Sequence, residues 1–126
     1  MSNEKTTLDT LYVINGSSES VTLEVIVGAK DQTSDMSIML DDTVIADKLA
    51  GSFKKKSLGT NEQLNGKKLS ILATISDTSR ETNLTSLLIR LRGGVDPGDF
   101  PLSKNVNDEG GSQDYICLIE FFNPLV

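Results

Sequence analysis

The sequence contains no histidine and no tryptophan, and among its 126 residues it has a single cysteine, Cys117. Without histidine there is no imidazole for general base catalysis, none to activate a serine or cysteine nucleophile, and no histidine ligand for zinc, copper or iron. Without tryptophan, the largest aromatic ring for stacking on sugars or bases is missing. These absences exclude most catalytic side-chain sets, so we expect a protein that is not an enzyme.

Positive charge is also scarce. Twelve basic residues stand against eighteen acidic ones, which gives a net charge of −6. Such a surface repels nucleic acid and anionic membranes at long range, so we expect no nucleic-acid partner. The hydrophobic share of 37% and the charged share of 24% are those of an ordinary globular protein. We therefore expect one folded domain over residues 1–126.

The lone Cys117 has no second cysteine with which to form an intramolecular disulfide, and it lies in the apolar run 115–122. A buried and unreactive thiol is expected there. The first residues have neither the basic nor the apolar segment of a signal peptide, and no stretch is long enough to predict a transmembrane helix. We expect a cytoplasmic protein, unless the sequence has been trimmed or the protein is secreted without a signal peptide.

Apolar residues recur at every second position in several short runs, which is typical of half-buried strands. The clearest run is 20–27, where Val21, Leu23 and Val25 share one face. Residues 10–14, 37–40, 68–76 and 85–92 show the same alternation. The last run, 115–122, is apolar on both faces apart from Glu120, which indicates a central strand or a strand whose outer face is covered.

Turn-forming residues separate these runs. Asn65-Gly66 has the composition of a tight hairpin, residues 77–81 are expected to join two strands as another hairpin, and residues 93–111 form the longest expected loop. The pattern predicts an all-β protein, a single-domain antiparallel β-sandwich of immunoglobulin-like or jelly-roll type with about seven or eight strands. Apolar spacing over residues 43–50 also allows one short helix, which Gly51 would end.

Carboxylates are the abundant reactive groups, and they gather in the expected loops. Calcium takes oxygen ligands, and loops that converge at one end of a sandwich can supply them. Aspartate also favours turns through bonds to its own backbone, and no EF-hand spacing is present. Structural turns and a calcium site that binds lipid or carbohydrate both remain open, and no other cofactor is expected. The calcium ligands would be Asp31, Asp35, Asp77, Asp96 and Asp99.

A third function, hydrolysis of glycosides by two carboxylates, is disfavoured because the chain is short and only 5% of its residues are aromatic. Each of the two groups of basic residues has two possible interpretations. The run 54–56 fits either a solvated edge strand or a phosphate patch. Arg90 and Arg92 alternate with apolar residues, so they can pair with acidic residues of a neighbouring strand or of another subunit.

The surplus of apolar residues near the C-terminus points to protein contact. One face of the run 115–122 fills the core, and the other needs a cover, from the 93–111 loop or from a second subunit. Phe100 either anchors that loop or projects as a contact residue, and the uncharged tail docks on its own domain or on a partner. We expect a protein-binding or assembly module, with its own copies or another protein as partner. The predicted contact residues are Phe100, Ile116, Leu118, Phe122, Leu125 and Val126.

Overall fold

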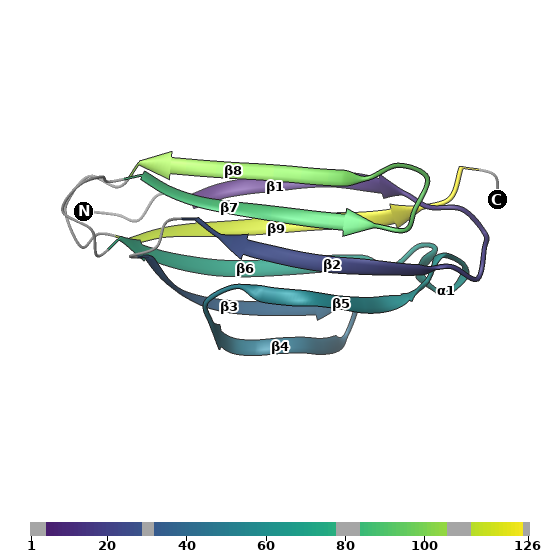
Figure 1. The fold of residues 1–126 in the computed structure, drawn as a ribbon, viewed down its shortest axis with the longest axis horizontal. Helices are drawn as coiled ribbons and strands as arrows, with labels where there is room; N and C mark the ends of the chain where they lie inside the picture. The colour runs from purple at the N-terminus through teal and green to yellow at the C-terminus, as the bar shows by residue number, and fades with distance from the viewer. Residues whose placement is uncertain (1–4, 29–31, 78–83, 106–111, 125–126) are drawn as a thin grey trace.

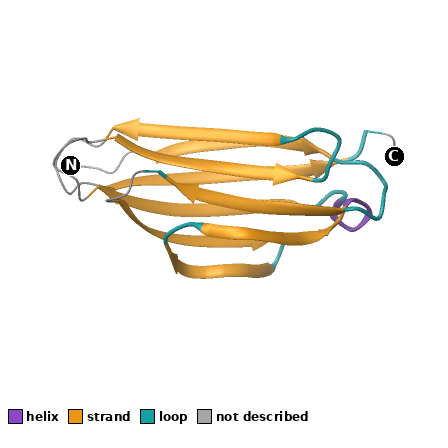
Figure 2. Cartoon of the chain, viewed as in Figure 1, coloured by secondary structure: helices purple, strands orange, loops and turns teal. Residues whose placement is uncertain are grey.

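The computed structural model describes residues 5–28, 32–77, 84–105 and 112–124, and this part of the chain is a β-sandwich, as the sequence predicts (Figures 1 and 2). Its strands form two sheets. The first sheet has five strands in the order β1 (Lys5–Val13), β9 (Ser112–Phe122), β6 (Lys68–Asp77), β3 (Gln32–Leu40) and β4 (Thr43–Ala50). The second has four in the order β5 (Phe53–Thr60), β2 (Ser20–Val27), β7 (Leu84–Arg92) and β8 (Gly98–Asn105).

All neighbouring strands are antiparallel except β1 and β9, which run parallel. The chain passes from one sheet to the other after most strands, and only β3–β4 and β7–β8 are consecutive neighbours within a sheet. The hairpin predicted across residues 77–81 is therefore wrong, because β6 and β7 belong to different sheets. Residues 78–83 themselves lie outside the described part of the chain.

One hydrophobic core fills the space between the sheets. The strict alternation of the strands decides which side chains enter it, since successive residues point to opposite faces. On β9 the inward residues include Tyr115, Cys117, Ile119 and Phe121, each no more than 1% exposed. The inward residues of the other central strands are Val21, Leu23, Val25, Met36, Ile38, Leu69, Ile71, Ile75, Leu87, Ile89 and Leu91.

Residues 43–50 form β4, so the short helix predicted there is wrong. Val44 and Ile45 are β-branched and suit a pleated strand, and a tight turn at Asp41, whose φ is 49°, returns the chain from β3. Irregular register between β3 and β4 leaves Ile45 and Ala46 both half-buried. Two adjacent half-buried residues break the alternation and imitate the apolar spacing of a helix.

The described residues contain one helix, α1 (Asn61–Leu64), at the right-hand end of the sandwich in Figure 1. Thr60 caps it: its side chain accepts from the backbone N–H of Gln63, whose side chain accepts in return from the Thr60 N–H. This reciprocal pair is a capping box. Asn65-Gly66 ends α1 and leads into β6, with a φ of 83° at Gly66, so the hairpin predicted at this pair is also wrong.

The long loop predicted over residues 93–111 is largely replaced by β8, which pairs with β7 from Leu91↔Gly98 to Leu84↔Asn105. Pro101 made this strand hard to predict from the sequence, because proline is rare inside strands. It is tolerated because β8 lies at the edge of its sheet, where one side of the strand needs no backbone N–H donors. Residues 106–111 lie outside the described part.

Candidate protein-binding surface

The outer face of the five-stranded sheet carries many apolar side chains, although the outer face of an antiparallel sheet is normally polar. Seven of them have exposed fractions between 36% and 59%, and Ile116 is half-buried. We call these eight residues the apolar face. They are Leu11 and Val13 on β1, Met39 on β3, Val44 on β4, Leu72 on β6, and Ile116, Leu118 and Phe122 on β9.

Strand register gathers the apolar face into a centre and a corner. In the centre, Leu72 lies directly opposite Ile116, and Leu118 lies one diagonal step away. Met39 and Val44 continue the centre toward the sheet edge as a second opposite pair. Side chains in these relations touch on a sheet surface. The corner is formed by Val13 opposite Phe122, with Leu11 beside them on β1.

Acidic side chains border the centre of the apolar face. Asp35 and Asp114 flank Thr74 in one row, two residues along the strands from Leu72. The Thr74 hydroxyl donates to the Asp114 carboxylate across 2.8 Å. Asp9 lies opposite Leu118 on the other side of the centre. A shallow hollow opens between the acidic row and the apolar pair, lined by Asp35, Ser37, Leu72, Thr74, Asp114 and Ile116.

The structure brings three of the six predicted contact residues onto this surface. Ile116, Leu118 and Phe122 all point outward from β9. Phe100 does not join them, because it lies in β8 opposite Ile89 and packs, partly buried, against the core. Leu125 and Val126 lie outside the described residues.

Five residues of the apolar face were missed as candidates. Val44 lies in the segment interpreted as a possible short helix, whereas the strands of the other four were recognised or partly recognised. Leu72 could have been predicted as an outward apolar residue, because it lies on the side of its strand that also carries Ser70, Thr74 and Ser76. Leu11, Val13 and Met39 carry no such local signal. They join the surface only through the parallel pairing of β1 with β9 and the pairing of β3 with β6.

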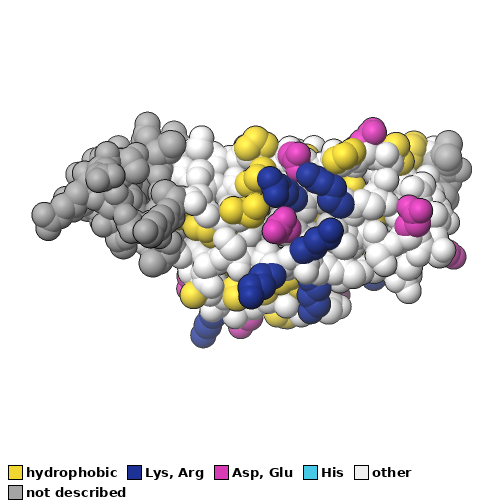
Figure 3. Space-filling view, in the orientation of Figure 1, with side chains coloured by type: hydrophobic (Ala, Val, Ile, Leu, Met, Phe, Trp, Pro, Cys, Tyr) yellow, Lys and Arg dark blue, Asp and Glu magenta, His cyan; other side chains and the backbone are white. Residues whose placement is uncertain are grey.

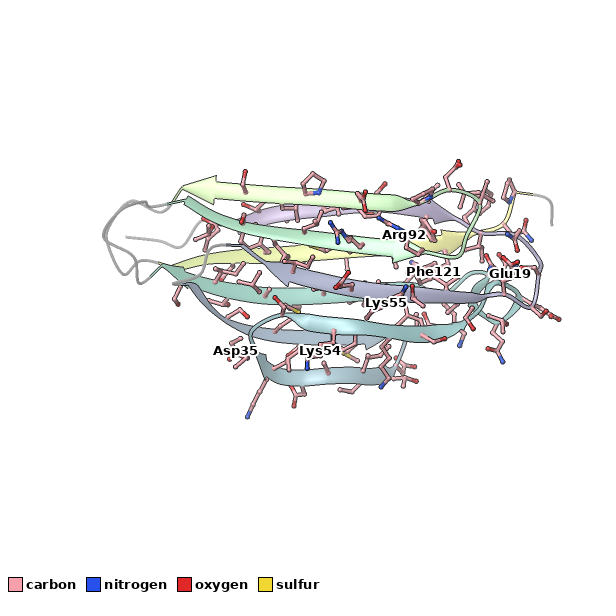
Figure 4. All side chains as sticks on the ribbon, in the orientation of Figure 1. Glu19, Asp35, Lys54, Lys55, Arg92 and Phe121 are labelled. Atoms are coloured by element: carbon pink, nitrogen blue, oxygen red, sulfur yellow. The ribbon has the colours of Figure 1, made fainter. Side chains whose placement is uncertain are left out.

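The predicted calcium ligands are divided between the two ends of the sandwich. Asp35 and Asp77 lie toward the end at which β6 finishes, whereas Asp96 and Asp99 lie in and after the β7–β8 turn at the other end (Figures 1 and 4). Asp31 lies outside the described residues. Within the described part of the chain, no three carboxylate or thiol side chains come together as metal ligands.

Because these carboxylates are separated, we expect calcium to have little effect on stability. Addition of about 1 mM calcium should leave the Tm within about one degree of its value in a chelator, since a ligand stabilises only the state that binds it. Differential scanning calorimetry with and without calcium measures this, with magnesium as the matched control. A rise of several degrees that only calcium produces would favour the calcium-dependent alternative.

Cys117 and Tyr12 are buried between the sheets, and both have a raised pKa. Burial raises the pKa of the Cys117 thiol to about 12, so the thiol stays protonated and unreactive at neutral pH. Burial also raises the pKa of Tyr12, against a smaller opposing effect of the Gly94 N–H, which donates to its hydroxyl across 3.0 Å. Both side chains belong to the hydrophobic core. The Tyr12 ring packs edge-on against Phe121, and its hydroxyl accepts the hydrogen bond from Gly94 in the β7–β8 turn.

No family model, curated protein or solved structure matches this chain. None of the helical structure in the described residues is long and apolar enough to cross a membrane.

Proposed function

We propose that this protein is a non-enzymatic assembly module that binds a second copy of its own chain through the apolar face. One observation carries the proposal: eight apolar side chains from five segments of the sequence share the outer surface of one sheet. Contiguous exposed apolar surface is typical of interaction sites in soluble proteins. Leu72, Ile116 and Leu118 form its centre, where truncation of a contact is expected to be most damaging.

The proposal predicts that a charge in the centre of the apolar face prevents association. We expect Leu72→Lys and Leu118→Lys each to weaken self-association about tenfold or more, because a lysine there must be desolvated when the surface is covered. Sedimentation velocity over a concentration range from micromolar to millimolar measures this. Ser18→Lys, at an exposed position between β1 and β2, is the matched control and should associate like the wild type.

Each variant should melt within a few degrees of the wild type, because both leucines are about half exposed. A wild-type protein that stays monomeric at millimolar concentration would contradict the proposal. So would a Leu72→Lys variant that associates as strongly as the wild type.

A further inference from the structure

The two sheets carry opposite charge. The strands of the four-stranded sheet contain six basic residues and two acidic ones, and those of the five-stranded sheet contain three basic and six acidic residues. In a chain with a net charge of −6, this concentrates positive charge on one side of the sandwich. Figure 3 views the four-stranded side and shows the dark blue side chains gathered over β2, β5 and β7.

A shallow hollow marks the middle of the basic side. We call the residues that line it the basic face: Thr22 and Glu24 on β2, Lys55 on β5, and Arg90 and Arg92 on β7. Lys55 and Arg92 lie on the side toward the viewer in Figure 4. Lys54 and Lys56 are exposed on the same edge strand as Lys55.

The basic face keeps donors that its own carboxylates do not occupy. Arg92 is held by Asp99 at 2.8 Å, as the predicted cross-strand pairing requires. Arg90 has a looser partner, since its Nη1 lies 3.7 Å from the Glu24 carboxylate and its side chain is 43% exposed. An exposed pair at that distance contributes little. Arg90 and Lys55 are therefore available to carboxylates from outside.

A row of apolar residues lies beside the basic face on the outer surface of the same sheet. Ile26, Leu88 and Pro101 lie opposite one another across β2, β7 and β8. The row two residues further along the same strands, about 7 Å away, contains Glu24, Arg90 and Asp99. Ile26 and Leu88 are half-buried, so they still present apolar surface.

The apolar face has the same arrangement with the opposite charge. The pair Leu72 and Ile116 lies two residues along the strands from the row that contains Asp35 and Asp114. The apolar row beside Asp35 and Asp114 on one sheet thus has a counterpart on the other sheet, where the apolar row lies beside a cluster of charged residues. That cluster has three basic residues, Lys55, Arg90 and Arg92, against the two carboxylates of Glu24 and Asp99. Two sheet faces can pack with their strands roughly aligned, which would bring both rows into contact at once.

We propose that copies of this chain assemble head to tail, with the basic face of one copy covering the apolar face of the next. This inference depends on the proposed function, because it names what covers the apolar face. The apolar row Ile26, Leu88 and Pro101 lies on Leu72 and Ile116, while Arg90 and Lys55 pair with Asp35 and Asp114. The contact is heterologous, so the assembly always has one free face at each of its two ends, and the chain of copies grows with concentration.

Charge reversal on either face tests the assembly. We expect Lys55→Glu with Arg90→Glu, and separately Asp35→Lys with Asp114→Lys, to weaken self-association about thirtyfold or more, since each places like charges opposite one another. Combining all four substitutions in one chain should restore association, because the charges are then exchanged but again complementary. Sedimentation velocity on the full chain, at low salt and at about 0.5 M sodium chloride, gives the readout; the wild type should weaken at high salt.

The outcomes separate this inference from the proposed function. If Leu72→Lys prevents association but Lys55→Glu with Arg90→Glu does not, the apolar faces of two copies meet each other, and the head-to-tail arrangement is wrong while the proposed function stands. A closed dimer whose mass does not rise with concentration overturns the inference in the same way. If the four-substitution chain stays monomeric while its thermal melt matches that of the wild type, the charge pairing is wrong.

Discussion

Replacing Asn61 by alanine is expected to lower the free energy of unfolding by about 3 kcal/mol, because three hydrogen bonds that join separate segments depend on this buried side chain. Its amide donates to the backbone carbonyls of Glu19, at 2.9 Å, and Gly93, at 2.8 Å. Its carbonyl accepts from the backbone N–H of Asn15 at 3.1 Å. Alanine would remove the partner of the Asn15 N–H and of the Gly93 carbonyl at a fully buried position, whereas the Glu19 carbonyl would still accept from the backbone N–H of residue 61.

Urea unfolding followed by circular dichroism measures this loss. Asn15→Ala is the matched control: the side chain of Asn15 accepts only a local bond, from the Ser17 N–H, and we expect a loss of about 1 kcal/mol or less. A loss below about 1 kcal/mol for Asn61→Ala would show that water replaces the amide and that the three segments are held by packing.

The class of fold could be predicted because the central strands alternate strictly. One side is buried along β2 from Val21 to Val25, along β6 from Leu69 to Ile75, and along β7 and β9, and alternation of apolar and polar residues is the direct result. Edge strands lack this signal, since they contact the core on fewer positions. In β5 only Phe53 is buried, and the exposed residues Lys54–Lys56 follow it directly. β8 contains Pro101, which is unusual inside a strand. For these reasons neither strand was predicted.

The topology could not be predicted, because it depends on pairing between distant segments. The parallel pair β1–β9 joins residues more than a hundred positions apart, and nothing in either strand specifies the direction of its neighbour. The same limit applies to the candidate site. Alternation separates Ile116 and Leu118 from the inward residues of β9, but only the register with β6 places Leu72 beside them.

Above pH 9, the protein is expected to lose stability because of its one cysteine. The pKa of the Cys117 thiol is about 12 in the folded protein, whereas an unfolded chain holds a thiol of ordinary pKa. Between these two values the folded protein keeps a proton that the unfolded chain has released, so the free energy of unfolding falls as the pH rises. Below about pH 8 both states hold the proton, and this group causes no pH dependence.

From pH 8 to pH 10.5 we expect a loss of about 2 kcal/mol from this group, measured by urea unfolding at a series of pH values. Cys117→Ala should lower stability by about 1 kcal/mol at pH 7, since it removes one buried atom, and its curve should stay nearly flat to about pH 10. Tyr12→Phe is the control, because the raised pKa of Tyr12 acts only above its ordinary value of 10.0 and this variant should keep the cysteine-dependent decline. A decline that is equally steep in Cys117→Ala would mean that another group causes it and that the pKa of the Cys117 thiol is not raised in the folded protein.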